Sequence, residues 1–355
     1  MGASGLEGFI EEVTGESYLR VEEDFGGGFV RLRMSEADRR QAQQDIRGVE
    51  DIVLELLRNS RDAGARMICV ATNRDGATRN IVVLDDGEGI PPEMQERVFE
   101  PRVTSRLDSF HADQWGVHGR GMALFSIACN STVHKVAKSG IGKGSAIQVV
   151  ADTTRLSEKA DQSTIPHLVI DDNGRKVVRG PRNINRIVTE FTLAQKSSCL
   201  VYLGSPNEVI ATLVAYGQRV LSAVEMAFPQ EIDEYPICLQ LAIAATPEEL
   251  TQIANSLGMT VSTRSARRIL DGQIEPLQPF VRYLNLDECV GKQAVPSKTG
   301  LKSRPIRMEE EDLAQFVVAV KAAYGELAQG YYLEPDIEPD IRITREGMRV
   351  FIPFA

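Results

Sequence analysis

The sequence predicts an α+β protein, and three observations from the first half of the chain support this. Residues 49–65 place apolar side chains at helical spacing, which predicts an amphipathic helix. Two strand-like runs follow at 67–71 and 81–84, and Asp75-Gly76 between them is a typical hairpin turn signal. Further strands are expected later in this half of the chain, at 132–138, 145–151 and 187–193.

The composition is that of an ordinary globular protein. Hydrophobic residues make up 43% and charged residues 25% of the 355-residue chain, and the formal net charge is −10. This charge argues against a surface covered by nucleic acid, although it leaves room for a local basic patch. The five cysteines are dispersed and none forms a pair at metal-ligand spacing. With no bilayer-length apolar run and no secretory signal, we expect a cytoplasmic protein with no membrane partner.

The helix over 49–65 carries a polar face as well as an apolar one. At about 100° per residue, Glu55, Asn59 and Asp62 fall within roughly 60° of one another. A carboxylate, an amide and a second carboxylate are therefore aligned along the helix. Taken alone, such a triplet is more often a solvated face than a binding site. Its interpretation depends on the motifs that follow in the chain.

The second strand continues directly into Asp85-Asp86-Gly87-Glu88-Gly89. Glycines beside acidic residues at a strand end allow the backbone to approach a ligand closely. The segment is a poor calcium loop, because the alternating oxygen ligands are missing. A short helix opened by proline is expected over 91–101.

A glycine-rich loop is expected to bind an anion where the next helix begins. Gly116-x-x-Gly119-x-Gly121 ends the polar segment 102–115 and precedes the apolar run 122–128. Backbone N–H groups and the positive end of the helix dipole both favour an anion at such a place. The loop is neither a Rossmann fingerprint nor a Walker loop, because no strand precedes it and no Gly-Lys-Ser/Thr follows.

In this order, the motifs resemble the ATP-binding domain shared by DNA gyrase B, MutL, the topoisomerase VI B subunit, large heat-shock chaperones and histidine kinases. This is the GHKL superfamily, and the resemblance covers roughly residues 30–195. It implies the Bergerat fold, a two-layer α/β sandwich with a mixed, mostly antiparallel sheet and helices on one face. It also implies that the ligands are ATP and Mg²⁺.

The resemblance further implies a role for each matching residue. Glu55 would be the general base, Asn59 would hold Mg²⁺, and Asp62 would orient its neighbours. Asp86 would accept the adenine amino proton, with Gly89 and Ile90 beside the base. The other implied nucleotide-binding residues lie in the lid and the glycine loop: Thr104, Ser105, Gly116, Val117, His118, Gly119, Arg120, Gly121 and Met122.

One position of the family pattern has two candidates in this chain. The family usually carries a Gly-Thr pair before the last strand of the domain, and the threonine assists at the adenine. Ser145 and Thr189 each offer a partial match. The nearby run 140–144 is interpreted as a hairpin turn rather than as a second phosphate loop.

Three functions stay open, and one is favoured. A glutamate at position 55 and an N-terminal ATP domain favour the hydrolase branch of the superfamily, and residues 118–128 are most similar to MutL and topoisomerase VI B. We therefore predict an ATP-gated switch whose 101–121 lid closes on ATP, with homodimerisation on binding and hydrolysis resetting it. Its client would be an unidentified protein or partner subunit. The alternatives are a stand-alone kinase of the histidine-kinase or anti-sigma type, and a module that binds nucleotide without hydrolysis.

The predicted domain organisation has three parts. Residues 1–195 would form the ATP-binding domain, with 1–40 as an arm, and 286–355 an α+β transducer-like region. Between them, 196–285 would be mainly helical, with a candidate helix-turn-helix insert whose Arg264, Arg267 and Arg268 are placed to contact DNA. A solvated helical hairpin is the more common explanation for such arginines. The family resemblance also implies a lysine that reaches the γ-phosphate, for which Lys298 is the first candidate beside Lys292 and Lys302.

Overall fold

The computed structural model describes two compact units, Met1–Gly291 and Lys292–Ala355. The described residues are 21–33, 36–104, 111–113, 116–118, 121–170, 176–195, 198–284, 317–318, 320–322, 324, 328, 339–343 and 348–351. In the second unit, β13 (Asp340–Ile343) and β14 (Met348–Phe351) form an antiparallel hairpin.

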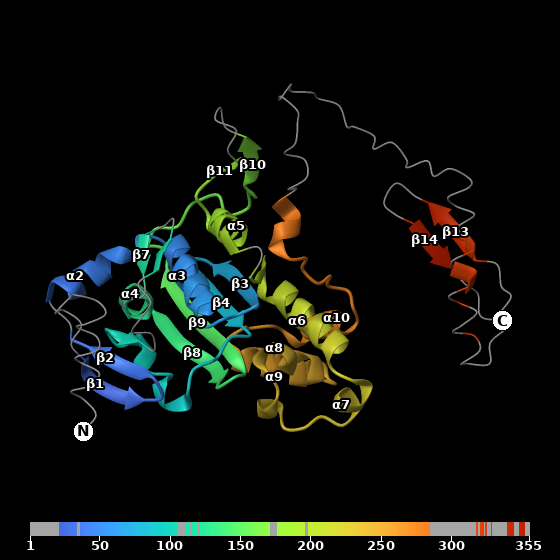
Figure 1. The fold of residues 1–355 in the computed structure, drawn as a ribbon, viewed down its shortest axis with the longest axis horizontal. Coiled ribbons are helices and arrows are strands. Elements are labelled where there is room, and N and C mark those ends of the chain that lie inside the picture. The colour runs from blue at the N-terminus through green and yellow to red at the C-terminus, as the bar shows by residue number, and fades with distance from the viewer. Residues whose placement is uncertain are drawn as a thin grey trace. The chain divides into compact units, whose positions relative to one another are not determined.

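A five-stranded sheet forms the centre of the first unit (Figure 1), with the strand order β12-β3-β4-β9-β8. Three antiparallel pairings join β3 to β4, β4 to β9 and β9 to β8, whereas β12 pairs with β3 in parallel. The sheet is therefore mixed and mostly antiparallel, as expected. The five strands are β3 (Met67–Asp75), β4 (Thr78–Asp85), β8 (Val133–Gly140), β9 (Gly144–Asp152) and β12 (Leu200–Gly204).

Helices cover both faces of this sheet, whereas the family resemblance implied helices on one face. Alternate residues of a strand point to opposite faces, and in β3 Ile68 and Val70 join one apolar core while Met67 and Cys69 join another. The first face carries α3 (Val49–Asp62), α4 (Ala123–Cys129) and α5 (Ile184–Gln195). The second carries α6 (Pro206–Val220), α8 (Ile237–Gln240), α9 (Pro247–Ser256) and α10 (Thr263–Leu270).

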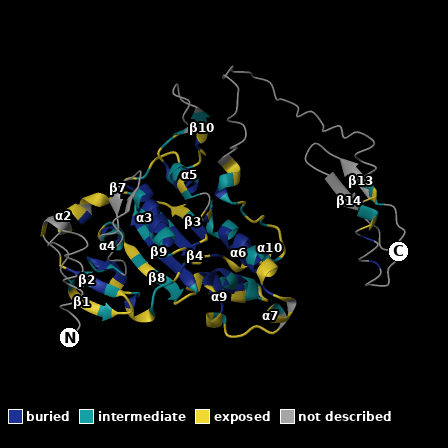
Figure 2. Cartoon of the chain, in the orientation of Figure 1, coloured by how far each residue is buried: buried dark blue, intermediate teal, exposed yellow. Residues whose placement is uncertain are grey.

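Burial explains why this sheet needs two helical layers. Strands covered on both faces are near-continuous apolar runs rather than alternating ones, and the start of β3 and the end of β4 are of that kind. Figure 2 shows α3 and the central strands in the colour of buried residues. Helices α6, α8, α9 and α10 thus pack within the first unit, on the far face of the sheet from α3.

The strand predicted at 187–193 is wrong, because these residues belong to α5. Ile184, Val188 and Phe191 are each at most 3% exposed and recur at helical spacing. Val188 and Thr189 are β-branched, which favours a strand locally, but the burial of one helical face outweighs that preference. The next strand is β12, which starts at Leu200.

The N-terminal elements lie against the lid segment. The strands β1 (Val21–Gly26) and β2 (Phe29–Leu32) form a hairpin whose three turn glycines, 26–28, have φ of 76°, 60° and 85°. Strand β5 (Val103–Thr104) extends this hairpin into a three-stranded sheet by pairing with β2. Helix α2 (Glu36–Asp45) is separate from α3.

In the helical layer, residues 206–227 form two helices, because Leu221 has extended backbone and Ser222 caps α7 (Ala223–Ala227). Helix α9 begins with a capping box, since Thr246 and Glu249 cap each other's backbone N–H groups. No helix in the described ranges is long and apolar enough to cross a membrane. The remaining elements are η1 (Pro92–Met94), η2 (Arg97–Phe99), β6 (His111–Asp113), β7 (Gly116–His118), β10 (His167–Ile170), β11 (Lys176–Arg179), η3 (Ile232–Glu234), η4 (Leu241–Ile243) and η5 (Phe280–Leu284).

Candidate nucleotide-binding site

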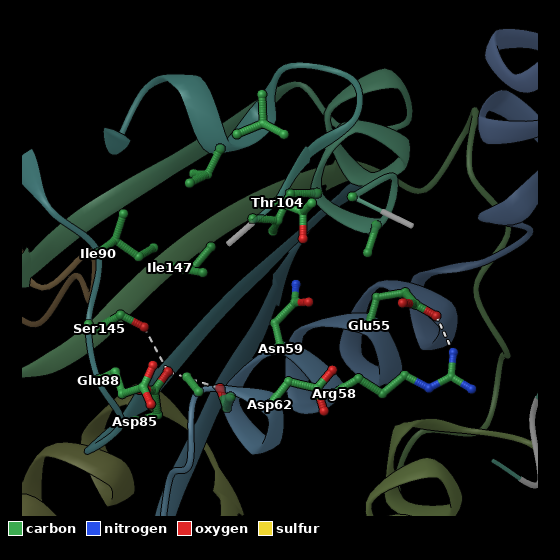
Figure 3. Close-up of a pocket in the computed structure, with 18 of the residues that line it drawn as sticks. Glu55, Arg58, Asn59, Asp62, Asp85, Glu88, Ile90, Thr104, Ser145 and Ile147 are labelled. Atoms are coloured by element: carbon green, nitrogen blue, oxygen red, sulfur yellow. Dashed lines mark hydrogen bonds and ion pairs between the residues drawn. The ribbon is translucent and has the colours of Figure 1, made fainter. Parts of the chain in front are cut away.

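A cleft lies over the polar face of α3, between that helix, the adjoining ends of β4 and β9, and the lid strand β5 (Figure 3). Of the residues that the sequence singles out, the cleft brings together Glu55, Asn59, Asp62, Gly89, Ile90, Thr104, Gly121 and Ser145. It also contains residues that the sequence interpretation missed: Phe29, Arg58, Ser60, Ala63, Asp85, Glu88, Val98, Val103, Ala123, Leu124 and Ile147. Figure 3 shows Asp85, Glu88 and Ser145 at one end, Glu55 and Arg58 at the other, and Asn59 between them.

Helix α3 holds its polar residues in place through its apolar stripe. Ile52, Val53, Leu56 and Leu57 are each at most 1% exposed, so the helix cannot rotate without breaking the core. The opposite face then directs Glu55, Asn59 and Asp62 to the cleft. The predicted amphipathic helix and its alignment of functional side chains agree with this arrangement.

Two of the α3 side chains have informative surroundings. Glu55 accepts a hydrogen bond from Arg58, with 2.5 Å between Nη1 and Oε1. The amide nitrogen of Asn59 is buried and has no hydrogen-bond partner among the described residues. A buried polar atom without a partner is costly in a folded protein and is often explained by a ligand or ion. Asn59 is therefore the α3 residue best suited to contact a bound ligand or ion.

Asp85 is a carboxylate at the end of β4 that lines the cleft, whereas Asp86, which the sequence singled out, is not among the lining residues. The Asp85 side chain is 2% exposed. Its Oδ2 accepts hydrogen bonds from Ser60 Oγ at 2.9 Å and Ser145 Oγ at 2.7 Å. Its Oδ1 accepts one from the backbone N–H of Gly87 at 3.0 Å. Burial raises the pKa of Asp85 above its ordinary value, although these three donors oppose the rise.

Asp86 faces away from the cleft. It is exposed, and its Oδ1 accepts hydrogen bonds from the backbone N–H groups of Arg66 and Met67 at 2.7 and 2.8 Å. The sequence contained the signal that separates the two residues. Ile81 and Val83 join the α3-side core, so the period of two along β4 places Asp85 on that face as well.

The structure brings Ser145, and not Thr189, to this carboxylate. Ser145 lies at the start of β9 opposite Asp85 in the strand register. Thr189 is in α5, is fully buried, and donates its hydroxyl hydrogen bond to the carbonyl oxygen of Asn185 at 2.7 Å. Thr189 is not among the residues that line the cleft, because its segment is a helix rather than the expected strand.

The loop after β4 is held by the 140–144 turn. Gly142 donates its backbone N–H to the Glu88 carbonyl oxygen at 2.7 Å, and Ile90 donates to Ser139 Oγ at 2.7 Å. Gly89 has φ of 75°, and a Cβ at this position would overlap the carbonyl oxygen of Gly140. Glycine is therefore required at position 89 both by its backbone conformation and by the close approach of the turn.

We expect Gly89→Ala to destabilise the protein by about 3 kcal/mol or more, because it combines a left-handed backbone with overlap of another chain segment. Gly76→Ala is the matched control: Gly76 has φ of 57°, and a Cβ there meets nothing within 4 Å. The control should lose about 1–2 kcal/mol, the cost of the backbone conformation alone. Chemical denaturation measures both, and equal losses would show that the packing of Gly89 on the turn contributes nothing.

The lid and glycine loop are described in part. Thr104 lies in β5, and Gly121, with φ of 65°, packs so closely on Val103 that a Cβ would lie 2.9 Å from its carbonyl oxygen. Met122 directly precedes α4. Gly116, Val117 and His118 form β7, which pairs with β6. Six predicted residues lie outside the described part of the chain: Ser105, Gly119, Arg120, Lys298 and its two alternatives, Lys292 and Lys302.

The buried carboxylate of Asp85 predicts a pH dependence of stability. Its pKa is higher in the folded chain than in the unfolded chain, so the folded state binds the proton more tightly. In the wild type, the contribution of Asp85 to the free energy of unfolding is greatest below the pKa of about 3.9 that the residue has in the unfolded chain. This contribution is lost as the pH rises through the higher pKa that Asp85 has in the folded chain. Asn does not titrate, so the wild type should lose stability relative to Asp85→Asn as the pH rises toward neutrality. Urea denaturation without nucleotide measures this, and parallel pH profiles would contradict it.

Comparison with known proteins agrees with this geometry. Residues 46–166 match the family model described as histidine kinase-, DNA gyrase B-, and HSP90-like ATPase. The DNA mismatch repair protein MutL of Clostridium perfringens is 32% identical over 117 residues, which are 32% of this chain and 17% of that protein. MutL of Pseudothermotoga lettingae is 38% identical over 127 residues, 34% of this chain and 22% of that protein. MutL of Thermus aquaticus is 43% identical over 86 residues, 24% of this chain and 16% of that protein.

Each of these similarities covers only part of this chain. The chain spans about a fifth of the length of the relatives it matches. A solved structure titled "Crystal Structure of N terminal domain of a DNA repair protein" is 17% identical with a TM-score of 0.24, covers 44% of this chain and 60% of its own, and supports no argument. The residues that the family model matches include α3, the Asp85 loop and β9. Residues 46–166 therefore form an ATP-binding domain of the GHKL superfamily, of the MutL-like kind.

Proposed function

We propose that this protein binds and hydrolyses Mg-ATP and acts as an ATP-gated dimerisation switch. One observation carries the proposal: a single cleft holds the hydrogen-bonded Asp85 at one end, Glu55 at the other, and the unpartnered amide of Asn59 between them. This arrangement provides separate places for the adenine, for a metal-bound triphosphate and for an attacking water.

The Asp85 end suits an adenine. A carboxylate offers about four lone-pair sites that can accept hydrogen bonds. The buried carboxylate of Asp85 accepts hydrogen bonds from two hydroxyls and can therefore still accept one from an amino group. Ile90 and Ile147 supply apolar surface on the same side of the cleft. Ser60 and Ser145 fix the carboxylate so that a purine amino group meets a preformed acceptor. In this proposal Asp85, rather than Asp86, recognises the adenine.

Asn59 is the proposed Mg²⁺ ligand, and its surroundings fit that role. Its amide nitrogen has no partner in the described chain, so a rotation that presents its oxygen to a cation breaks no hydrogen bond of that nitrogen. No cluster of three or more His, Cys, Asp or Glu in the described ranges could hold a metal. This suits Mg²⁺, which usually takes one or two protein ligands and completes its shell with waters and substrate phosphates. Bound there, it would neutralise charge on the phosphate oxygens.

Glu55 is the proposed general base. It lines the cleft one helical turn before Asn59, so it would lie near a phosphate held at the amide. Its carboxylate would accept a proton from water as the water oxygen bonds to the γ-phosphorus and ADP leaves. The lid over 101–121 would close on the triphosphate and exclude bulk water, with Thr104 and Gly121 at its two ends.

Closure is proposed to promote association of two copies, with Lys298 from the second unit as a candidate γ-phosphate contact. Such coupling requires contacts that the γ-phosphate makes in the closed state only. We further propose a protein client or partner subunit. DNA is a weaker candidate, supported by Arg264, Arg267 and Arg268, which are exposed on α10.

The test combines three measurements on the wild-type chain. Titration calorimetry with Mg-ATP should show binding, steady-state assays should show slow phosphate release, and light scattering should show a dimer with a non-hydrolysable ATP analogue. ATP binding without phosphate release would refute the hydrolase. Transfer of labelled phosphate to a protein instead would favour the kinase alternative. A mass that does not change with the analogue would refute the dimerisation switch while leaving hydrolysis intact.

A further inference from the structure

A positively charged side chain shares the cleft with the proposed general base. Arg58 lines the cleft on α3, three residues after Glu55. Its Nη1 lies 2.5 Å from Glu55 Oε1, and the two side chains are 6% and 19% exposed. Figure 3 shows the pair at the end of the cleft opposite Asp85. This is a largely buried, hydrogen-bonded ion pair directly at the proposed place of reaction.

The helix fixes the backbone positions of both partners. Leu56 and Leu57, between Glu55 and Arg58, are each at most 1% exposed. A guanidinium is planar and presents its N–H donors in a rigid fork, so a carboxylate bonded to it takes a defined orientation. Without such a partner a glutamate side chain keeps considerable rotamer freedom, which must be lost before it can act on a water.

The next arginine on the helix provides a contrast. Arg61 pairs with Asp62 at 2.8 Å and is 17% exposed, but it is not among the residues that line the cleft. The two arginines thus lie on the same helix, each has a carboxylate partner on that helix, and each side chain is less than a fifth exposed. They differ in whether they face the cleft and in whether their partner is Glu55.

We propose that Arg58 is a positioning residue that orients the Glu55 carboxylate for activation of the attacking water. The inference rests on the proposed ATP hydrolysis and deepens it. Arg58 keeps its charge throughout: the proton lost by water goes to Glu55, the water oxygen bonds to phosphorus, and the bond to the ADP oxygen breaks with its electron pair. Arg58 acts through Glu55 and not on the phosphate.

The test uses Arg58→Gln, Arg58→Lys, the control Arg61→Gln, Glu55→Gln and the double variant Arg58→Gln/Glu55→Gln. Arg58→Gln should lower kcat about 10–100-fold, the effect of a displaced catalytic group. The Kd for Mg-ATP should stay within about threefold of wild type, a factor worth less than 1 kcal/mol. Arg58→Lys should recover part of kcat, because it restores the charge without the planar fork. Arg61→Gln should keep the wild-type kcat.

The double variant separates positioning from other roles. If Arg58 acts through Glu55, adding Arg58→Gln to Glu55→Gln should cause no further loss, so the two effects are not additive. A purely structural role would instead lower ATP binding and thermal stability in both backgrounds. Retained ATP binding by each variant shows that it is folded.

Three results would overturn the proposal. An Arg58→Gln variant with wild-type kcat shows that Glu55 needs no such partner. A Kd raised tenfold or more in both the wild-type and the Glu55→Gln background shows that Arg58 binds the nucleotide itself. A wild type that binds Mg-ATP without releasing phosphate refutes the proposed hydrolysis, and the role of Arg58 with it. That last failure is seen in the wild type before any variant is measured.

Discussion

Asp85→Asn is expected to weaken Mg-ATP binding about 10–100-fold, the effect of losing a hydrogen bond to a charged, buried group. The carboxylate accepts from Ser60, Ser145 and the Gly87 N–H, and an amide has a single oxygen to replace those acceptor sites. The remaining –NH₂ group would face the adenine amino group as a second donor. Titration calorimetry at neutral pH measures the change in Kd.

Asp86→Asn is the matched control for this prediction. It makes the same chemical change one residue further along the chain, at an exposed carboxylate bonded to the backbone N–H groups of Arg66 and Met67. Its Kd for Mg-ATP should stay near the wild-type value. A loss of binding in Asp86→Asn with little change in Asp85→Asn would reverse our assignment of the adenine carboxylate.

Glu55→Gln is expected to reduce phosphate release by about 10²–10⁴-fold, the usual contribution of a general base. ATP binding should be preserved, because the glutamine is nearly isosteric and Asp85 and Asn59 are untouched. The expected result is therefore a loss of kcat with little change in Kd, measured by steady-state phosphate release beside calorimetry. Such a variant should also hold ATP long enough for a dimer to be detected by light scattering.

Glu88→Gln controls for the loss of a negative charge in the cleft. Glu88 lines the same cleft at the Asp85 end, away from Glu55 (Figure 3). Its substitution should leave kcat within a few-fold of wild type, since proton transfer to a carboxylate depends on position. Equal losses in the two variants would mean that the overall charge of the cleft, and no particular base, limits the reaction.

The parts of the fold that the sequence predicts well depend on signals within a few residues. The α3 stripe and the Asp75-Gly76 hairpin each rest on local chemistry. The grouping of Glu55, Asn59 and Gly121 in one cleft agrees with the order of the motifs and the family resemblance, which left Ser145 and Thr189 as alternatives. In these cases local preference and tertiary packing favour the same structure.

The parts that were missed depend on contacts between distant segments. Val188 and Thr189 favour a strand locally, and only the core beneath α5 makes them helical. The pairing of β12 with β3 joins segments more than 120 residues apart. Arg58 and Phe29 could not be placed at the cleft from spacing alone, since one looks like an ordinary surface charge of a helix and the other belongs to a separate hairpin. Asp85 differs, because the period of two along β4 was available in the sequence.

Strand β12 lies at the edge of the sheet beside β3 but is synthesised long after it, and this has a consequence for the chain during synthesis. Nearly all described residues of the cleft precede residue 148, yet one edge of β3 lacks its partner until Leu200–Gly204 has left the ribosome. The apolar face that contains Met67, Cys69 and Leu84 stays uncovered longer still, until the helices after Ser205 have been synthesised. A nascent chain that already holds the nucleotide motifs therefore displays an open strand edge and a bare apolar surface. During synthesis, the open edge of β3 and this uncovered apolar face are where a chaperone would be most needed.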